Sequence, residues 1–261
     1  MPAIEQVNSA LYVIRLPNPG PTVVARVTSE GVILVDDMYE NHYEPILALL
    51  KTVTPLPVKY VISTHHHGDH TGANVKFLQH AQILGHKNAR AAMTGGEKPL
   101  PGPPPITYTT EAAVHLGGVE VQLHYVGRGH TNGDTVVYFP DLRVITAGDL
   151  FFMIDRPPVV DYANGGTSLG WLPTIDNILK FDFETVIPGH GPVSVRADLV
   201  RFKQRMETLQ ARVRGLIRAG VQKDQYLTKL KVDDLGWTLD PSSVFMRLTA
   251  SGFYDELAAT Q

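Results

Sequence analysis

The sequence predicts an α/β (α+β) fold built as a sandwich of strands and helices. Short β-branched runs bounded by turn residues are typical of strands. Segments with apolar residues at steps of three and four are typical of helices that pack on one face. Because clusters of such strands alternate with helices, an α/β sandwich is favoured over an all-β barrel. No Ser/Gly linker or charge block interrupts the chain, so we expect a single domain over residues 1–261, with C-terminal helices from about residue 196.

The first half of the chain is predicted to alternate strands with helices. Strands at 10–16 and 22–27 should pair across the proline-rich turn 17–21, and a third strand is expected at 31–36. The apolar pattern then predicts a helix over 41–53 and a buried strand over 58–63. The remaining expected elements are a short helix at 71–80, a strand at 82–85, a helical turn at 88–93 and a Pro/Gly-rich loop at 95–105.

The second half is predicted to hold two hairpins, one further strand and two helices. The hairpins join 114–116 to 119–126 and 135–139 to 143–146, and the strand lies at 185–187. Helices are expected at 168–180 and 196–219. The longer one has a single apolar face, formed by Leu199, Phe202, Met206, Leu209, Val213 and Ile217. This face predicts packing on the rest of the domain, and a homodimer contact is the alternative.

Composition narrows the classes of partner. The net charge of −3 and the pI near 6.4 speak against nucleic-acid binding, which favours a basic stripe. No apolar run is long enough for a membrane span, and no N-terminal signal pattern is present. Cysteine is absent, which removes disulfides and thiolate ligands and leaves the compartment open. We therefore expect a soluble protein with a small-molecule substrate, cytoplasmic, or periplasmic if a signal peptide was removed.

A run of potential metal ligands follows the strand at 58–63. His65, His67, Asp69 and His70 lie within six residues, and Gly68 lets the chain turn between them. Neutral imidazole and carboxylate are the ligands that zinc and its first-row neighbours accept. Further candidates stand beside glycine just beyond other predicted strands: His130, Asp149 and His190. A metal site at one edge of a sheet would place the seven side chains in this way.

This order of residues resembles the metallo-β-lactamase superfamily, whose pattern is H-x-H-x-D-H followed by a distant His, Asp and His. The resemblance covers about three quarters of the chain and implies a four-layer αββα sandwich, the metallo-β-lactamase fold. It also implies one metal held by His65, His67 and His130, and a second held by Asp69, His70 and His190. Asp149 would bridge both ions.

The implied chemistry is dinuclear zinc-dependent hydrolysis, with Fe or Mn as alternatives to the two Zn²⁺ ions. Two cations about 3.5–4 Å apart lower the pKa of a bound water and yield a hydroxide that attacks an activated carbonyl. The resemblance implies that Asp69 is catalytic, binding metal and passing a proton. Asp36 or Asp37 is expected to orient a ligand imidazole, although a solvated turn acid explains them equally well.

The substrate is left among β-lactams, lactones and thioesters, with a broad or weak β-lactamase as one form. Asp149 stands where the best-known lactamase subclass has a cysteine. Phe152 stands where that subclass has a lysine that binds the carboxylate of the drug. The alternatives are a mononuclear iron oxidoreductase of the persulfide dioxygenase type and a glyoxalase-type thioesterase. Five residues are candidates for the rim of the site, each as either a surface residue or a substrate contact: Arg128, Arg156, Tyr162, Asn164 and Trp171. Phe151 and Phe152 are expected to form either an apolar wall of the site or part of the core.

Overall fold

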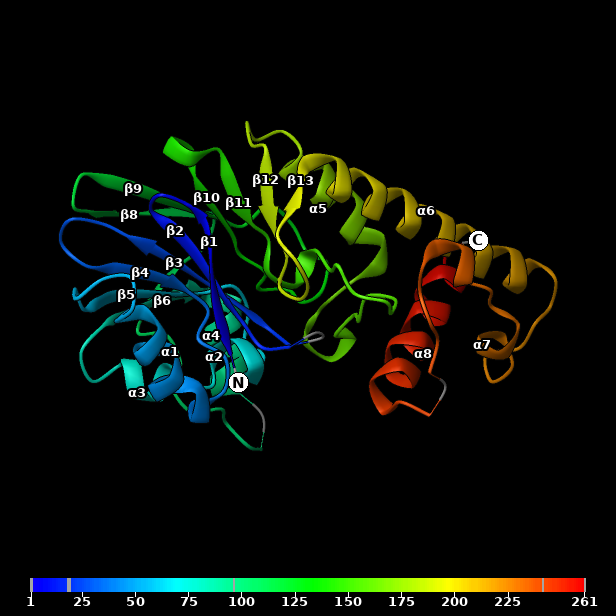
Figure 1. Ribbon diagram of the computed structural model, residues 1–261. Coiled ribbons are helices and arrows are strands. Elements are labelled where there is room, and N and C mark those ends of the chain that lie inside the picture. The colour runs from blue at the N-terminus through cyan, green and yellow to red at the C-terminus, as the bar shows by residue number, and fades with distance from the viewer. Residues whose placement is uncertain (1, 18–19, 96, 241, 261) are drawn as a thin grey trace.

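Two β-sheets lie face to face, with helices on both outer sides (Figure 1). This arrangement comes from a computed structural model, which describes residues 2–17, 20–95, 97–240 and 242–260. It confirms the α/β sandwich and its four-layer αββα order. No helix among these residues is long and apolar enough to cross a membrane.

In the first sheet, the strands that the structure describes lie side by side in the order in which they occur in the sequence. These strands are β1 (Ala3–Asn8), β2 (Leu11–Arg15), β3 (Thr22–Val27), β4 (Val32–Val35), β5 (Val58–Ser63), β6 (Gln82–His86) and β7 (Ile106–Tyr108). The strands from β1 to β4 are antiparallel, and those from β4 to β7 are parallel. The carboxyl ends of β4 and β5 therefore lie at one edge of the sheet. The expected turn 17–21 includes residues 18 and 19, which lie outside the described residues.

The second sheet brings together the two predicted hairpins. Its order is β13 (Ser194–Val195), β12 (Thr185–Ile187), β11 (Val144–Thr146), β10 (Val136–Phe139), β9 (Val119–His124) and β8 (Glu111–Leu116). All neighbours are antiparallel except β11 and β12, which are parallel. The loops after β11 and β12 consequently leave the sheet at the same edge.

Alternation along the strands builds the layers. In β2, Leu11 and Val13 are buried between the two sheets, whereas Ile14 faces the opposite side. Ile14 belongs to a separate cluster with Ile46 of α1 (Tyr43–Leu50) and Phe77 of α3 (Asn74–Phe77). The helices α2 (Gly68–Thr71) and α4 (Lys87–Thr94) follow β5 and β6.

The outer layer on the second sheet consists of α5 (Ser168–Ile178) and α6 (Arg196–Arg218), and α8 (Val244–Ala258) packs on these two helices. Leu199, Phe202 and Met206 of α6 are buried in one cluster with Ile145 and Val186 of the sheet. The predicted apolar face of this helix is therefore covered by the chain itself, and a homodimer stays a prediction.

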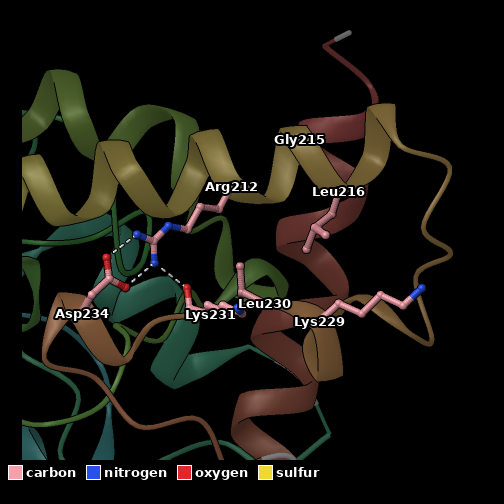
Figure 2. Close-up of a pocket in the computed structure, with 7 residues that line it drawn as sticks. All are labelled: Arg212, Gly215, Leu216, Lys229, Leu230, Lys231 and Asp234. Carbon is pink, nitrogen blue, oxygen red and sulfur yellow. Dashed lines mark hydrogen bonds and ion pairs between the residues drawn. The ribbon is translucent and has the colours of Figure 1, made fainter.

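The C-terminal segment packs against the distal half of α6. It contains α7 (Tyr226–Lys229) and α8, and Figure 1 shows both beside the far end of α6. Figure 2 shows Arg212 of α6 reaching Asp234 and the carbonyl of Lys231, with contacts of 2.7 and 2.6 Å from Nη1. The Asp234 carboxylate thus offsets the charge of Arg212. We assign no ligand to the pocket that Arg212, Lys231 and Asp234 line.

Three short strands and helix α8 were not identified from the sequence patterns. Strand β1 is exposed along much of its length, β7 has three residues and β13 has two. Such edge strands lack the buried alternation that identifies a strand. Helix α8 contains Thr249, Ser251 and Gly252, which are weak helix formers. Packing on α6 and α5 outweighs that weak preference.

Candidate metal centre

All seven predicted ligands converge at one edge of the two sheets. The segment His65–His70 begins two residues after the end of β5, and Asp149 lies in a 3₁₀ turn just after β11. His190 follows the end of β12, and His130 lies in the loop between β9 and β10. The predicted placement of these residues beyond strand ends is therefore correct.

One group of donor atoms consists of His65, His67, His130 and Asp149. Nδ1 of His67 lies 2.9 Å from Nε2 of His130, and Nε2 of His130 lies 3.5 Å from Oδ2 of Asp149. Nε2 of His65 is 3.9 Å from the same oxygen. Donor atoms on one zinc ion lie within about 4 Å of each other, so this spacing fits a single cation.

A second group consists of Asp69, His70 and His190. Nε2 of His190 lies 3.3 Å from Oδ2 of Asp69 and 3.3 Å from Nε2 of His70. Oδ1 of Asp149 lies 3.2 Å from Nε2 of His70 and 3.5 Å from Nε2 of His190. The two carboxylate oxygens of Asp149 therefore face different groups, which is the geometry a bridging ligand requires.

Buried polar atoms in the cluster also fit a cation. Nε2 of His65 and Oδ1 of Asp149 are buried and make no hydrogen bond within the described part of the chain. Leaving such groups unsatisfied is costly, and coordination of a cation would satisfy both. The all-nitrogen-and-oxygen donor set suits zinc and also admits iron or manganese.

Hydrogen bonds at the far side of the imidazoles fix which nitrogen faces the cluster. Nδ1 of His70 donates to Oδ2 of Asp36 (2.8 Å), and Nδ1 of His130 donates to the carbonyl of Val159 (2.7 Å). Nε2 of His67 donates to Oδ2 of Asp161 (2.9 Å). Because these acceptors cannot donate, the other nitrogen of each neutral ring keeps its lone pair for a metal.

Of Asp36 and Asp37, which the sequence offered as candidates, Asp36 is the one that orients His70. Its carboxylate also accepts the Thr64 amide and hydroxyl, at 2.7 and 2.8 Å. Its backbone adopts the left-handed conformation, with φ of 62°. Such strain persists where surrounding contacts enforce it, and here three hydrogen bonds hold the side chain. Asp37 is instead fully buried and accepts the amide of Ala73.

The electrostatics show that the cluster attracts positive charge. Burial alone would raise the pKa of Asp69, but His70 and His190 lower it to about 2. Burial lowers the pKa of His130 to about 4, which favours the neutral ring that a metal needs. For His190 burial is outweighed by Asp149, and the pKa rises to about 9. Divalent cations would supply the positive charge that these carboxylates stabilise.

The loop containing His190 approaches Asp149 closely. A Cβ added to Gly189 would lie 2.0 Å from Oδ1 of Asp149, so only glycine leaves room for the carboxylate there. The amide of Met153 donates to the His190 carbonyl at 2.9 Å, which ties this loop to the segment after Asp149.

A cavity of about 390 Å³ opens onto the cluster. Tyr39, Phe152, Val159 and Arg156 line it together with ligand candidates. Phe152 stacks on His190, with ring centroids 5.7 Å apart. The apolar wall predicted for this position is therefore present at Phe152.

The other rim candidates have structural contacts. Trp171 is fully buried and donates from Nε1 to the carbonyl of Leu150, so its suggested place on the rim was wrong. Phe151 belongs to the core against Phe202. Tyr162 and Asn164 donate to Glu256 and Asp161, respectively, and the carbonyl of Arg128 accepts from Thr174.

Asp161 is the residue that sequence reasoning missed. Burial would raise its pKa, but hydrogen bonds from His66 and His67 outweigh burial and lower it, so the carboxylate is charged. Nε2 of His66 lies 3.4 Å from Oδ2 of Asp161, so His66 contacts the same carboxylate as His67. Asp161 follows no strand and carries no motif, so no local signal identified it.

Comparisons with known proteins agree with this geometry. The family model described as the metallo-beta-lactamase superfamily matches residues 12–190. A metallo-beta-lactamase type 2 from Bacillus cereus is 28% identical over 180 residues, covering 66% of this chain and 68% of that protein. The alpha subunit of 2,4-dinitroanisole O-demethylase from Nocardioides sp. (strain JS1661) is 28% identical over 200 residues, covering 75% of this chain but 60% of that subunit.

Solved structures share the fold. A metallo-beta-lactamase from Pontibacter korlensis superposes with a TM-score of 0.70 at 20% identity, over 79% of this chain and 99% of that chain. The DIM-1 metallo-beta-lactamase superposes with a TM-score of 0.67 at 22% identity, over 79% of this chain and 97% of that chain. At such identities the likeness concerns the fold alone.

Proposed function

Because the chain belongs to the metallo-β-lactamase superfamily, we propose that it is a dinuclear zinc hydrolase of activated carbonyl compounds. The observation that carries the proposal is Asp149, whose two oxygens face two separate groups of histidine and aspartate donors. When bound there, two cations would activate a water and polarise a carbonyl oxygen.

The protein's own residues supply positioning and proton transfer. Asp69 is the most exposed carboxylate of the cluster, with 24% of its side chain accessible, and it lines the cavity. It is therefore placed to hold a proton and deliver it to a leaving group. Phe152 and Val159 form an apolar wall that excludes water from one side of the substrate.

Arg156 is proposed to select substrates that carry an anionic group. It lines the same cavity and makes no ion pair with any residue that the structure describes. A guanidinium can bind a carboxylate with two parallel hydrogen bonds. Replacing Arg156 with alanine should raise KM about 10-fold for an anionic β-lactam, equivalent to about 1.4 kcal/mol.

The KM of a neutral lactone should change little in the same variant, which makes that substrate the internal control. Arg201→Ala, on the exposed side of α6 where Arg201 pairs with Asp198, serves as the matched arginine control. An equal rise in KM for charged and neutral substrates would contradict the assignment of Arg156.

The proposal as a whole is tested by metal analysis together with a substrate panel. We expect close to two zinc ions per chain, and hydrolysis of at least one of nitrocefin, a lactone and a thioester. An aryl methyl ether, 2,4-dinitroanisole, joins the panel because a demethylase subunit is among the relatives. One iron per chain with oxygen uptake and no hydrolysis would instead favour the persulfide dioxygenase alternative. Turnover of glutathione thioesters alone would favour the glyoxalase type.

A further inference from the structure

The loop 156–168 contacts two of the candidate ligands from outside the cluster. Asp161 accepts from Nε2 of His67, and the carbonyl of Val159 accepts from Nδ1 of His130. The amide of Asp161 also donates to the His130 carbonyl at 2.8 Å. The orientation of both rings therefore depends on where this loop lies.

The loop contains one short 3₁₀ turn, Tyr162–Asn164, and no other regular structure before α5 begins at Ser168, so contacts from other elements must fix it. The segment 129–132 supplies some of them through its backbone, and helix α8 supplies several others through Glu256. Oε2 of Glu256 accepts the Tyr162 hydroxyl at 3.0 Å and the Ser168 amide at 2.8 Å. The carboxylate also accepts the hydroxyls of Thr167 and Ser168. One half-buried carboxylate thus holds the second half of the loop.

Two further contacts come from the same helix. The hydroxyl of Thr249 lies 3.1 Å from the Val160 amide and 3.3 Å from the Val160 carbonyl. The ring of Tyr162 lies directly on Gly252, where an added Cβ would come within 2.2 Å of Cδ2. Three residues of one face of α8 therefore meet the loop on both sides of Asp161.

We propose that Glu256 is a positioning residue for the metal centre and that α8 holds the loop that orients His67 and His130. The inference rests on the proposed function in one respect, namely that the cluster binds metal. Helix α8 lies beyond residues 12–190, so the family match assigns it no role. Groups that hold ligand imidazoles from behind raise metal affinity because the rings no longer need to be ordered on binding.

The test measures zinc binding to the full chain by competition with a chromogenic chelator. Glu256→Ala should weaken at least one zinc-binding constant about 10-fold and alter the visible bands of the cobalt-substituted protein. Glu256→Gln should restore much of the affinity, because its amide oxygen can still accept from Tyr162 and Ser168. Gly252→Ala should also weaken binding, although alanine favours a helix more than glycine does.

Asp255→Asn is the matched control, because Asp255 is the neighbouring acid on α8 and pairs with Lys223 on the exposed side. It should leave both zinc constants and the cobalt bands unchanged. In an Asp161→Ala background, Glu256→Ala should weaken zinc binding by less than about a further 3-fold, since the effects of coupled residues are not additive. If Glu256→Ala fails to fold, Gly252→Ala decides the question, because an added Cβ there would displace Tyr162 and weaker zinc binding is the expected result.

Unchanged zinc-binding constants and cobalt bands in folded Glu256→Ala and Gly252→Ala would overturn the role of Glu256 and leave the proposed function intact. Weakened zinc binding in these variants, combined with a wild type that binds zinc but hydrolyses none of the panel, would support the role of Glu256 and overturn the proposed function. In that case α8 positions a metal centre whose reaction is not the proposed hydrolysis. A wild-type chain that binds no zinc would overturn both.

Discussion

Replacing Asp149 with alanine is expected to reduce bound zinc from two ions per chain to one or fewer and to lower kcat/KM at least about 10³-fold. A loss of 10³ in rate corresponds to about 4 kcal/mol of transition-state stabilisation. This is the largest effect we expect from a single substitution at the site. It follows from the position of Asp149 between the two groups of donors.

The physical reason is that each oxygen of Asp149 serves a different group. Oδ1 lies 3.2 Å from Nε2 of His70, and Oδ2 lies 3.5 Å from Nε2 of His130. Alanine removes a donor from both groups at once. It also removes a negative charge that offsets the repulsion between two cations about 3.5–4 Å apart.

Metal content and turnover are measured on the same preparation of Asp149→Ala, with circular dichroism as a check that it is folded. Asp182→Ala is a suitable control, because Asp182 is an exposed acid that pairs with Arg143 away from the cluster. Two zinc ions and unchanged hydrolysis in Asp149→Ala would exclude the bridging role. They would also remove the main support for a dinuclear site.

The second large effect is expected for Asp161→Ala, which should lower zinc affinity and kcat/KM by about 10- to 100-fold. Asp161 accepts from Nε2 of His67 at 2.9 Å, so its loss frees that ring to rotate and to change tautomer. His66 loses the same partner. The zinc affinity and kcat/KM of Asp161→Asn should lie between those of the wild type and of the alanine variant, because the asparagine side-chain oxygen can still accept one hydrogen bond.

Zinc titration separates this role from a purely structural one. The melting temperature of the metal-free protein should change little in Asp161→Asn, while that of the zinc-loaded protein falls, since tighter binding stabilises the folded state. Asp155→Ala is the control, because Asp155 is an exposed acid in the same loop region and is not among the residues that line the cavity. Equal zinc affinity in Asp161→Ala and wild type would show that His67 needs no external support.

The sequence was sufficient for the main strands and for the set of candidate ligands. Apolar runs ending at Ser63, Thr146 and Ile187 gave the positions of β5, β11 and β12, because burial within a strand leaves a local pattern. The side chains just beyond those ends were recognised by their type and order. In the structure Asp149 lies between the two groups that the family pattern implied.

The tertiary structure alone decided what holds those ligands in place. The hydrogen bond of His67 with Asp161 spans 94 residues, and that of Thr167 with Glu256 spans 89. Nothing in the neighbourhood of Asp161 or Glu256 along the chain distinguishes them from surface acids. Their partners are set by how α8 packs on α6 and α5, and such packing is a property of the whole fold. Local residue patterns therefore determined the strands and the metal-binding side chains, whereas the folded chain determined their support, because contacts between distant segments leave no periodic signal.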